Sequence, residues 1–597
     1  MKKNILSQVV LAGTIVFSQQ MTFAQSVSDL LMQKLKAGAA AANQGQPQQQ
    51  QQKVAAQPQP VANVAQAVAA KNDADLDNMV PVPLTTEIID ETKSTISLAQ
   101  VEILNRLQEL ANLASQEGYL PRWSLDNNQI QKLNTLASQS SGSALATEVL
   151  NVSQKICLDF YRGHITPEMV SDKAKVSSKK ITKLQQDALK AFASGQLTAN
   201  ELLSQFRPKN FYYQNLVNTF IKVTQAENSG FYAQAPATLS VVKPGIKNKA
   251  VVLYARQLLN ILGYTNNTQD ESYNDDLNAA IKAFQTNQNL AADGALGPQG
   301  WAWLNLNVKQ LKTRLIINID RSRWLPDNLG AENVFVNLAM QKLRYTVDGQ
   351  TAMEFKTING RIDRQTPILF DRISFLMLNP TWTAPDSIVR KDKLIMFAGH
   401  TDPATGLEDV KANPHKVLDL NMKMYSDAND QEVDPMTYDW SYYRRQLDAC
   451  TLKTIANGTC KINVIHTFVQ QPGIRNALGM IKFPLANPYS IYLHDTDSRH
   501  LFNEPKRLLS SGCVRLQKPF DFAEKLLNNP EQWSKQQLLD ATENLPVPAT
   551  ESTRVNIGRT IPVVIFYLTT HLSDNGQVSF AADVYGTDLI TLNLMNK

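Results

Sequence analysis

Cys513 and His494 are the two residues of this chain whose types and positions favour nucleophilic catalysis. A cysteine thiol near neutral pH is mostly protonated, whereas the thiolate is the nucleophile, so a neighbouring imidazole that takes the proton would leave a reactive thiolate–imidazolium pair. The two residues are 19 positions apart, so they meet only if two strands lie side by side. The alternative is a buried structural cysteine after a turn and an unrelated histidine, and spacing alone leaves both interpretations open.

The segments that carry these two residues have the pattern of strands and a turn. Alternating apolar residues over 489–493 predict a half-buried strand that delivers His494 at its end. The cluster 510–512 predicts a turn that presents Cys513, after which the alternation resumes. A helix is predicted over 521–527. These elements would place the thiol and the imidazole on neighbouring strands.

Groups next to this pair are candidates for binding a substrate. Gly512 lets the backbone approach a substrate carbonyl closely, and the amides of Gly512 and Cys513 are candidate donors to an oxyanion. Tyr492 lies two residues before His494, and Arg515 lies two residues after Cys513, so alternation places each on the face of its neighbour. We expect Tyr492 to line the site and Arg515 to bind a substrate carboxylate or to fix the loop.

The same stretch resembles the catalytic signature of the L,D-transpeptidases, the YkuD-type enzymes that cross-link peptidoglycan. The family pattern is a His, followed later by a Ser-x-Gly-Cys element with an Arg two positions after the Cys. In this chain the pattern reads His494 with Ser510-Ser511-Gly512-Cys513-Val514-Arg515. Many members carry a second His where this chain has Ser511, but Ser-Ser-Gly-Cys-Val-Arg is usual in the long periplasmic branch, which the runs 471–483 and 492–496 also resemble.

The resemblance implies a mechanism. Cys513 would attack the bond between diaminopimelate and the terminal D-Ala of a tetrapeptide stem, with His494 taking the thiol proton and returning it to the leaving amine. An amine of a second stem would then attack the thioester and form a 3→3 cross-link. Asp495 would orient His494 through its backbone carbonyl, because its carboxylate points to the opposite face if the strand continues. Ser511 is assigned to the substrate site with Tyr492 and Arg515. The resemblance also implies acylation by carbapenems and no cofactor.

Other functions stay open at this point. Water as the acceptor would make the chain an L,D-carboxypeptidase, and a free D-amino acid would make it an exchange enzyme. An outer-membrane lipoprotein is a further candidate acceptor. A catalytically inactive wall-binding protein is the alternative from a different class. The oligomeric state is left open.

The seven His residues show no zinc-ligand spacing and no phosphate-binding loop is present, so no metal or nucleotide is expected.

The N-terminus has the features of an exported protein. Lys2 and Lys3 precede an apolar run, and a small residue at Ala24 suits signal-peptidase cleavage, so residues 1–24 are predicted to be a signal peptide and the location periplasmic. An uncleaved anchor is the alternative. Residues 25–75 are rich in Gln, Ala and Pro and predict a disordered linker. The net charge of +5, which falls to +3 without the two lysines, argues against a nucleic-acid partner.

The remaining chain is too long for one core and predicts a multidomain α+β protein. Helical periodicity, including segments at 181–192, 198–205 and 210–223, predicts a helical scaffold over 76–245. A three-helix unit over 246–308 resembles a peptidoglycan-binding domain, through motifs such as Arg256-Gln257-Leu258-Leu259 and Asp293-Gly294-Ala295-Leu296-Gly297. A β-rich YkuD-type catalytic domain is expected over 309–588, beginning with a strand at 311–320, and residues 589–597 are expected to be a tail.

A polar segment, 395–465, interrupts the predicted catalytic strands, and the resemblance places a lid over the active site there. Its aromatic and basic residues, Tyr438 to Arg445, would suit a substrate with sugars and carboxylates or simply pack a small subdomain. Cys450 and Cys460 lie ten positions apart, which makes a disulfide plausible in an oxidising compartment. That pairing would leave Cys157 and Cys513 as free thiols.

Four residues elsewhere are predicted to have no catalytic role. Cys157 and His164 are expected to be core or surface residues, because no acid pair or metal-ligand spacing accompanies them. Trp324 and Trp382 are expected to pack in the core.

Overall fold

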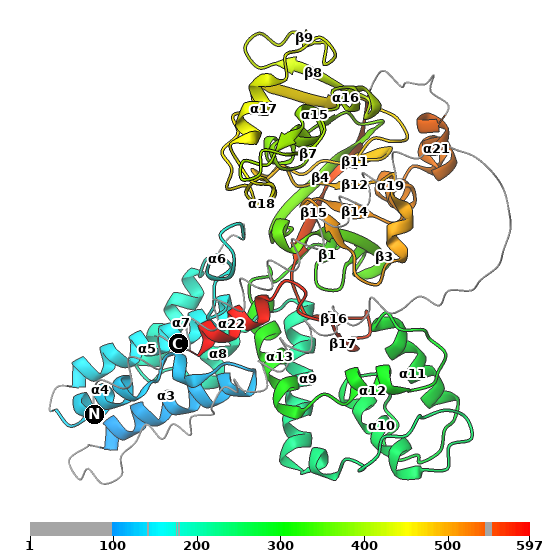
Figure 1. The fold of residues 1–597 in the computed structure, drawn as a ribbon. Helices are drawn as coiled ribbons and strands as arrows, with labels where there is room; N and C mark the ends of the chain where they lie inside the picture. The colour runs from blue at the N-terminus through cyan, green and yellow to red at the C-terminus, as the bar shows by residue number, and fades with distance from the viewer. Residues whose placement is uncertain (1–97, 140–141, 175, 177–178, 544–551, 597) are drawn as a thin grey trace. The chain divides into compact units, whose positions relative to one another are not determined.

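The computed structural model describes residues 98–596 apart from 140–141, 175, 177–178 and 544–551 (Figure 1). The predicted signal peptide and linker lie outside these described residues. Contacts divide the chain into two compact units: the described part of the smaller unit is 384–468, and the larger unit holds the described residues before and after it. Among the described residues, no helix is long and apolar enough to cross a membrane.

The first part of the larger unit is helical, as the periodicity predicts. Side-chain caps define several helix starts: Thr182 and Thr198 form capping boxes with Gln185 and Glu201, and Asn210 accepts from the Tyr213 amide. The helices are α3 (Leu98–Gln116), α4 (Asn127–Ala137), α5 (Gly142–Arg162), α6 (Pro167–Val170), α7 (Lys183–Ala193), α8 (Ala199–Phe206) and α9 (Phe211–Asn228), with the 3-10 turns η1 (Pro121–Trp123) and η2 (Phe231–Gln234).

Three further helices follow where the three-helix unit is predicted. A buried guanidinium joins the first two of them, since Arg256 pairs with Asp276 at 2.5 Å and donates to the carbonyls of Asp270 and Ser272 in the connecting loop. Gly263 has a φ of +86° at the end of the first helix, a backbone conformation that favours glycine at a helix C-terminus. The helices are α10 (Lys249–Ile261), α11 (Asp275–Asn287) and α12 (Pro298–Leu304).

The predicted strand over 311–320 is wrong, because these residues lie in helix α13 (Val308–Ser322). The run of β-branched residues favoured a strand. However, Asn307 caps the helix by accepting from the Lys309 amide, and the helix is buried on every side from residue 313 onward. The buried residues include Arg314, Asn318 and Asp320 as well as the apolar ones, so burial by the surrounding elements, rather than an apolar stripe, accompanies the helix.

The sequence predicted to form the catalytic domain folds into a nine-stranded sheet in the order β13-β3-β14-β12-β11-β4-β15-β1-β2, which closes on itself because β2 also pairs with β3. The strands are β1 (Asn333–Asn337), β2 (Lys342–Val347), β3 (Gln350–Gly360), β4 (Leu369–Leu378), β11 (Ile481–Phe483), β12 (Leu493–His494), β13 (Leu508–Ser510), β14 (Val514–Leu516) and β15 (Thr553–Phe566). The 3-10 turns η3 (Ile362–Arg364) and η5 (Arg499–Asn503) lie in its loops.

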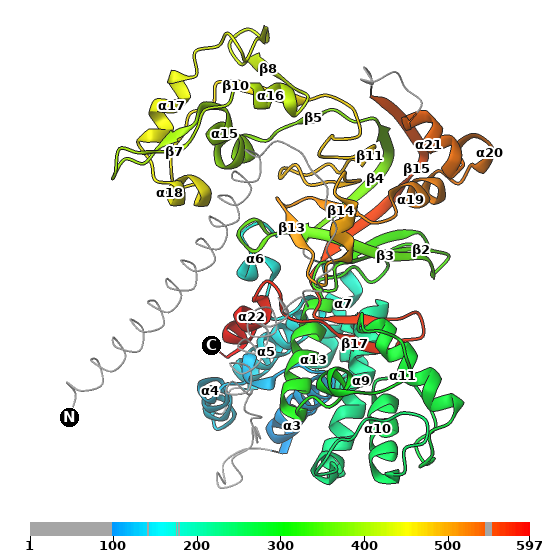
Figure 2. The same ribbon diagram turned by 45° about the vertical axis from the view of Figure 1, so that its right-hand side comes forward.

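One face of the central strands is covered by helix α19 (Pro519–Leu527), which contains the predicted helix 521–527 (Figure 2). Phe522 of α19 packs against Phe483 with ring centroids 5.0 Å apart. The fully buried side chains of Leu493 and Val514 belong to the same apolar core. Residues that alternate with these point to the opposite face of the sheet. Helices α20 (Pro530–Trp533) and α21 (Lys535–Glu543) follow α19.

The end of the chain returns to the helices of the larger unit. The hairpin β16 (Thr570–Leu572) and β17 (Val578–Phe580) is followed by α22 (Thr587–Met595), so a helix occupies most of the predicted tail. Arg321 of α13 pairs with Asp588 of α22 at 2.5 Å, and both side chains are buried. This ion pair ties the C-terminal helix to α13.

The smaller unit coincides with most of the predicted insertion. Two of the aromatic residues for which substrate contact and packing were both open are buried within it: Trp440 and Tyr443 pack among Phe397 and Phe468. Its elements are α14 (Asp386–Ile388), the π-helical turn η4 (Val389–Lys393), α15 (Leu394–Ala398), β6 (His400–Thr401), β7 (Glu408–Val410), α16 (His415–Asp419), β8 (Met422–Ser426), β9 (Glu432–Val433), α17 (Ser441–Asp448), α18 (Leu452–Asn457) and the first part of β10 (His466–Gln470).

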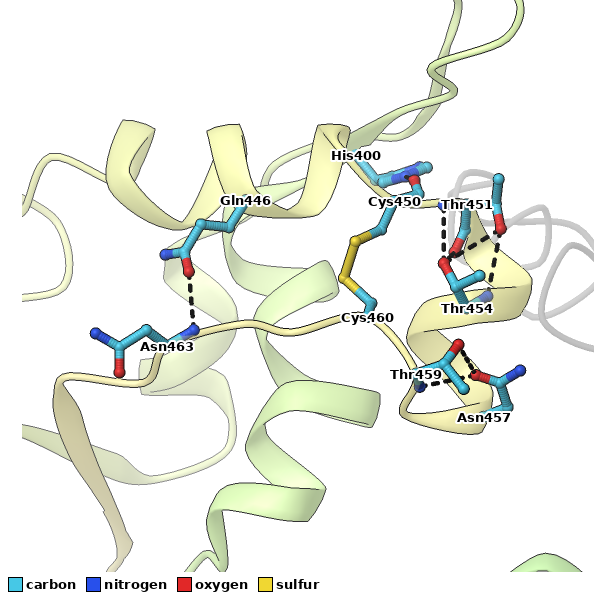
Figure 3. Close-up of a disulfide and its surroundings, with 9 residues drawn as sticks. All are labelled: His400, Gln446, Cys450, Thr451, Thr454, Asn457, Thr459, Cys460 and Asn463. Carbon is cyan, nitrogen blue, oxygen red and sulfur yellow. Dashed lines mark hydrogen bonds between the residues drawn. A yellow bond between two sulfur atoms is a disulfide. The ribbon is translucent and has the colours of Figure 1, made fainter.

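The disulfide between Cys450 and Cys460 is confirmed, with Cα atoms 5.9 Å apart (Figure 3). His400 contacts the Cys450 carbonyl through Nε2 at 2.7 Å. Helix α18, capped by Thr451, lies inside the loop that the disulfide closes. Cys157 and Cys513 are the free cysteines of the described chain.

Candidate active site

The sheet brings His494 and Cys513 together by pairing β12 with β14 in parallel. The register places Leu493 opposite Val514 and His494 opposite Arg515, and Cys513 comes immediately before β14. Because Leu493 and Val514 face the core, His494 and Cys513 belong to the other face. The strand at 489–493 is shorter than predicted, since β12 contains only Leu493 and His494, but the histidine still ends a strand.

The thiol of Cys513 is half-buried and donates to the backbone carbonyl of Ser490 at 3.5 Å. Ser490 has a φ of +53°, an uncommon conformation for a residue other than glycine. Burial raises the pKa of the Cys513 thiol to about 11, although hydrogen bonding by Tyr492 and the positive charges of Lys482 and Arg515 act in the opposite direction. The thiol is therefore protonated at neutral pH.

The imidazole of His494 is oriented by the backbone that follows it. Its Nδ1 lies 2.5 Å from the carbonyl oxygen of Asp495, so Nδ1 carries the hydrogen and Nε2 is left as the basic nitrogen. The side chain is only 4% exposed. Burial, followed by the charge of Arg515, lowers the pKa of His494 to about 3. The imidazole is thus neutral.

The carboxylate of Asp495 is engaged away from the imidazole. It accepts from the Met480 amide at 3.0 Å and from Arg499 at 2.7 Å. Burial raises the pKa of this carboxyl group, and these hydrogen bonds partly offset the effect. Asp495 therefore contacts His494 through its carbonyl oxygen, while its side chain fixes the preceding loop and the start of η5.

Burial acts against the expected thiolate–imidazolium pair, because it raises the pKa of the Cys513 thiol and lowers the pKa of His494. No hydrogen bond in the described part of the chain joins the Cys513 sulfur to His494. The physical reason for both pKa shifts is that both groups are buried, and burial penalises each charged form. A neutral imidazole remains able to accept a proton when the thiol attacks.

A network of short hydrogen bonds holds the turn before Cys513. The hydroxyl of Ser510 donates to the Cys513 carbonyl at 2.6 Å and accepts from the Gly512 amide at 3.1 Å. The hydroxyl of Thr366 donates to the Gly512 carbonyl at 2.7 Å. Gly512 has a φ of +125°, and a Cβ there would lie 3.2 Å from Ile491. The turn thus requires glycine for its backbone conformation.

This network changes the set of candidate oxyanion donors. The Gly512 amide, predicted as a donor to substrate, is instead used by Ser510. Among the hydrogen bonds of the described residues, none uses the Cys513 amide. Of the two predicted amides, that of Cys513 is the one available to a substrate.

Lys482 is a site residue that the sequence reasoning missed. It lies on β11 directly opposite His494, on the same face of the sheet, and its ammonium group is 4.1 Å from the centre of the Tyr492 ring. Burial lowers the pKa of Lys482, and no ion pair within the described ranges involves it. A lysine between the buried residues Ile481 and Phe483 was the available signal, because alternation turns its side chain outward.

The three residues predicted to bind substrate, Tyr492, Arg515 and Ser511, differ in their burial and in their hydrogen-bond partners. The ring of Tyr492 lies edge-on to His494, with centroids 5.7 Å apart. The Nε of Arg515 is buried without a hydrogen-bond partner among the described residues, and burial lowers the pKa of this guanidinium. Ser511 is exposed and accepts from Arg364 at 3.1 Å. Arg515 therefore has capacity for a ligand, whereas Ser511 already has a protein partner.

Of the two tryptophans assigned to the core, Trp324 is buried and donates to the Ile165 carbonyl at 2.7 Å. Trp382 is also buried, but it hydrogen-bonds to Tyr492 and so supports the wall of the site. Within the described ranges, no group of three or more His, Cys, Asp or Glu side chains is placed to hold a metal ion.

Comparison with known proteins identifies two domains. Residues 332–557 match the family described as "L,D-transpeptidase catalytic domain" (YkuD), and residues 248–304 match "Putative peptidoglycan binding domain". The first match contains every site residue described above. Domains of these kinds act on peptidoglycan, so the chain is placed in an extracytoplasmic or periplasmic location.

A curated relative from Haemophilus influenzae, "Putative L,D-transpeptidase", is 28% identical over 363 residues. The match covers 56% of this chain and 66% of the relative, just under two thirds of its length. A crystal structure of an L,D-transpeptidase (residues 123–326) from Xylanimonas cellulosilytica is 14% identical and covers 56% of this chain and 98% of that one. Its TM-score of 0.16 is too low to inform the arrangement of this chain. The matches identify residues 332–557 as a YkuD-type L,D-transpeptidase catalytic domain and residues 248–304 as similar to the putative peptidoglycan-binding domain.

Proposed function

We propose that this protein is a cysteine-dependent L,D-transpeptidase that forms 3→3 cross-links between peptidoglycan stem peptides through a thioester on Cys513. One observation carries the proposal: parallel pairing of β12 with β14 puts His494 and Cys513 on one face of the sheet, with the imidazole oriented by the Asp495 carbonyl. The family match supplies the substrate class.

The neutral state of both groups supports proton transfer during attack rather than before it. The Cys513 sulfur attacks the carbonyl carbon of diaminopimelate, and Nε2 of His494 takes the thiol proton. The tetrahedral intermediate collapses to a thioester, and the same proton goes to the departing D-Ala amine. In the second step an amine of another stem attacks the thioester, the new amide forms, and the proton returns through His494 to the thiolate.

The oxyanion of each tetrahedral intermediate needs a donor. The Cys513 amide is our candidate, because it has no partner in the described hydrogen bonds, whereas the Gly512 amide is used by Ser510. One well-placed donor contributes about 3 kcal/mol to the stability of such a transition state. Gly512 serves the reaction by permitting the turn that aims this amide.

Two cations on the same face suit the carboxylates of the donor stem. Lys482 has no acidic partner in the described part of the chain, and Arg515 has a buried, unpaired Nε. Charge-assisted hydrogen bonds to carboxylates are about twice as strong as neutral ones. We assign Arg515 and Lys482 to a stem carboxylate, with Tyr492 lining the site between them and His494.

The wider organisation of the protein follows from this function. We propose that residues 1–24 export the chain to the periplasm, 25–75 tether it, 76–245 and 246–308 form a scaffold and a wall-binding domain, and 309–588 perform catalysis. The disulfide of Cys450 and Cys460 supports an oxidising location. The mechanism needs no metal or cofactor, because the exchanged stem bond supplies the acyl group.

The test incubates the purified protein with disaccharide-tetrapeptide muropeptides and reads the products by mass spectrometry, with Cys513→Ala in parallel. Cross-linked dimers that have lost one D-Ala, and that are absent with the variant, would establish the transpeptidase. A mass adduct on Cys513 after carbapenem treatment would identify the acylated residue. Dimers formed equally by the variant would refute the role of Cys513.

The product also separates the remaining functions. Tripeptide monomer alone would mean that water is the acceptor, and exchange of the terminal D-Ala would mean that a D-amino acid is. Adding an outer-membrane lipoprotein peptide tests that acceptor. Absence of any product, with the protein retained on purified sacculi, would favour an inactive wall-binding protein.

A further inference from the structure

One cavity in the larger unit is lined by segments other than those that carry the candidate catalytic residues. It measures about 660 Å³, within the range of small-molecule sites. Three segments line it: α9, the end of α10 with the turn over 263–266, and the tip of the β16–β17 hairpin at 575–577. Only the second segment belongs to the matched peptidoglycan-binding domain, so this junction pocket is a composite of that domain, the helical region and the C-terminal hairpin.

The lining of the junction pocket is dominated by neutral groups that donate and accept hydrogen bonds. The polar side chains that matter most for a ligand are Asn218, Lys222, Thr265, Asn266, Asn575 and Gln577. The side chains of Asn218, Asn266 and Asn575 are exposed, and in the described part of the chain none of the three has a hydrogen-bond partner. Lys222 is the one ionisable cation of the lining, and no carboxylate lies among the lining residues.

The walls of the junction pocket are held in place before any ligand arrives. The Val578 amide donates to the Leu262 carbonyl at 2.9 Å, and the Phe580 amide donates to Gln288 at 2.9 Å, so the hairpin is attached to the three-helix domain. At the hairpin tip, Gly576 approaches α9 so closely that a Cβ would lie 2.3 Å from Asn215. Preformed walls reduce the entropy lost when a ligand binds.

We propose that the junction pocket binds the glycan strand of peptidoglycan, through the hydroxyl and N-acetyl groups of its amino sugars. Amide side chains both donate and accept, which matches hydroxyl and acetamido groups. The absence of acidic lining residues disfavours a cationic ligand, and a single lysine suits a ligand with few carboxylates rather than a polyanion. The proposal rests on the proposed function, because it takes peptidoglycan as the substrate.

The composite lining determines which parts of the protein would hold peptidoglycan. The three-helix domain supplies one wall of the junction pocket, while α9 and the hairpin supply the others. The glycan would therefore be bound by the larger unit as a whole rather than by residues 248–304 alone. Glycan binding would anchor the strand and leave the attached stem peptides free to reach Cys513.

The test measures binding of fluorescently labelled glycan strands, freed of their peptides by an amidase, to the full chain by anisotropy. We expect the double variant Asn218→Ala/Asn575→Ala to raise the Kd at least fivefold. Asn266→Trp, which places a bulky ring in the opening, should abolish binding. Gln225→Ala is the matched control, since Gln225 is exposed on α9 and does not line the junction pocket.

A second measurement separates this proposal from the proposed function. Release of D-Ala from a soluble disaccharide-tetrapeptide should be unchanged in all three pocket-directed substitutions, because none of them touches the site of Cys513. The proposal would be overturned if the pocket variants bound glycan with the same affinity as the unmodified chain. It would also be overturned if Gln225→Ala lost as much affinity as the pocket variants, or if binding required the stem peptide. Any of these results would leave the transpeptidase activity standing.

Discussion

The chain contains two Cys–His combinations, and they differ in almost everything except residue type. Cys157 lies in α5 and His164 follows seven residues later, whereas Cys513 and His494 come from different strands. His164 even has an acidic partner, since its Nδ1 is 2.9 Å from Asp159. By composition alone, the first combination would look more like a catalytic triad than the second.

The surroundings separate the two combinations. Cys157 is fully buried, and burial without any compensating charge raises its pKa far above the ordinary range. The ring of His164 stacks on Trp123 at 4.2 Å. Cys513 is half-buried, and Lys482 and Arg515 both act to lower its pKa.

The comparison teaches that a catalytic thiol is recognised by the charges and access around it. Both thiols are protonated at pH 7, so protonation does not distinguish them. What distinguishes Cys513 is a neutral, carbonyl-oriented imidazole and two cations on an accessible face. Substitutions near Cys513 and His494, each paired with a matched substitution near Cys157 and His164, test this difference.

Removing each thiol should give the largest difference. Cys513→Ala should reduce cross-linking by at least about 10³-fold, because the covalent path is lost. Cys157→Ala should leave the rate within about twofold and reduce the free energy of unfolding by about 1–2 kcal/mol, because it leaves a small cavity in the helical core. Muropeptide analysis and urea unfolding measure the two effects. A comparable loss of rate in Cys157→Ala would contradict the contrast.

Removing each imidazole should give the next largest difference. His494→Ala should lower kcat by about 10²–10⁴-fold, since general-base catalysis contributes that much. His164→Ala should keep the rate, and it should cost about 1 kcal/mol of stability through the lost stacking and hydrogen bond. Initial rates of D-Ala release from a soluble tetrapeptide report on both. If the two variants lost activity equally, the assignment of His494 as the base would fail.

Two glycines next to these cysteine and histidine residues allow a finer test. Gly512→Ala strains a φ of +125° beside Ile491, so we expect a fall in kcat of about 10²-fold from misplacing Cys513. Gly163 has a φ of +92°, and a Cβ there would lie 2.7 Å from Trp324 Nε1. Gly163→Ala should instead cost about 1–3 kcal/mol of stability, with kcat per folded molecule unchanged. Rates normalised to the folded fraction distinguish these outcomes.

The smallest expected effect concerns thiol reactivity. Because the pKa of Cys513 is about 11, its alkylation by iodoacetamide should accelerate roughly tenfold per pH unit between pH 7 and 10. Lys482→Met removes a positive charge and should raise this pKa further, slowing alkylation at pH 8 by about 3–10-fold. Lys525→Met, an exposed change on α19, is the control. Cys157 should be alkylated only when the protein unfolds. Equal alkylation rates of Cys513 in the two lysine variants would argue that Lys482 does not lower the pKa of Cys513.

Local patterns predicted the elements that hold the site. The turn before Cys513, the strand end at His494 and helix α19 are confirmed, and so are the helices predicted over 181–192 and 198–205. Each depends on side-chain alternation or on a cap within a few residues, which a single sequence contains. Helix α13 was predicted wrongly because its run of β-branched residues favoured a strand, whereas the Asn307 cap and burial on all sides accompany a helix.

The sequence by itself determined which residue types stand beside the nucleophile and which short elements carry them. It specified Gly512 at a turn, Arg515 two positions beyond Cys513 and an export-like N-terminus. Those features are local, so no partner distant in the chain is needed to predict them.

Only the tertiary structure decided the electrostatics and the use of the backbone groups. It placed Lys482 opposite His494, gave the Gly512 amide to Ser510 and left both catalytic groups neutral. It also assembled the junction pocket from three segments that are distant in the chain. The physical reason is that burial and strand register depend on contacts across hundreds of residues, and these set the pKa of a group more strongly than its neighbours in sequence.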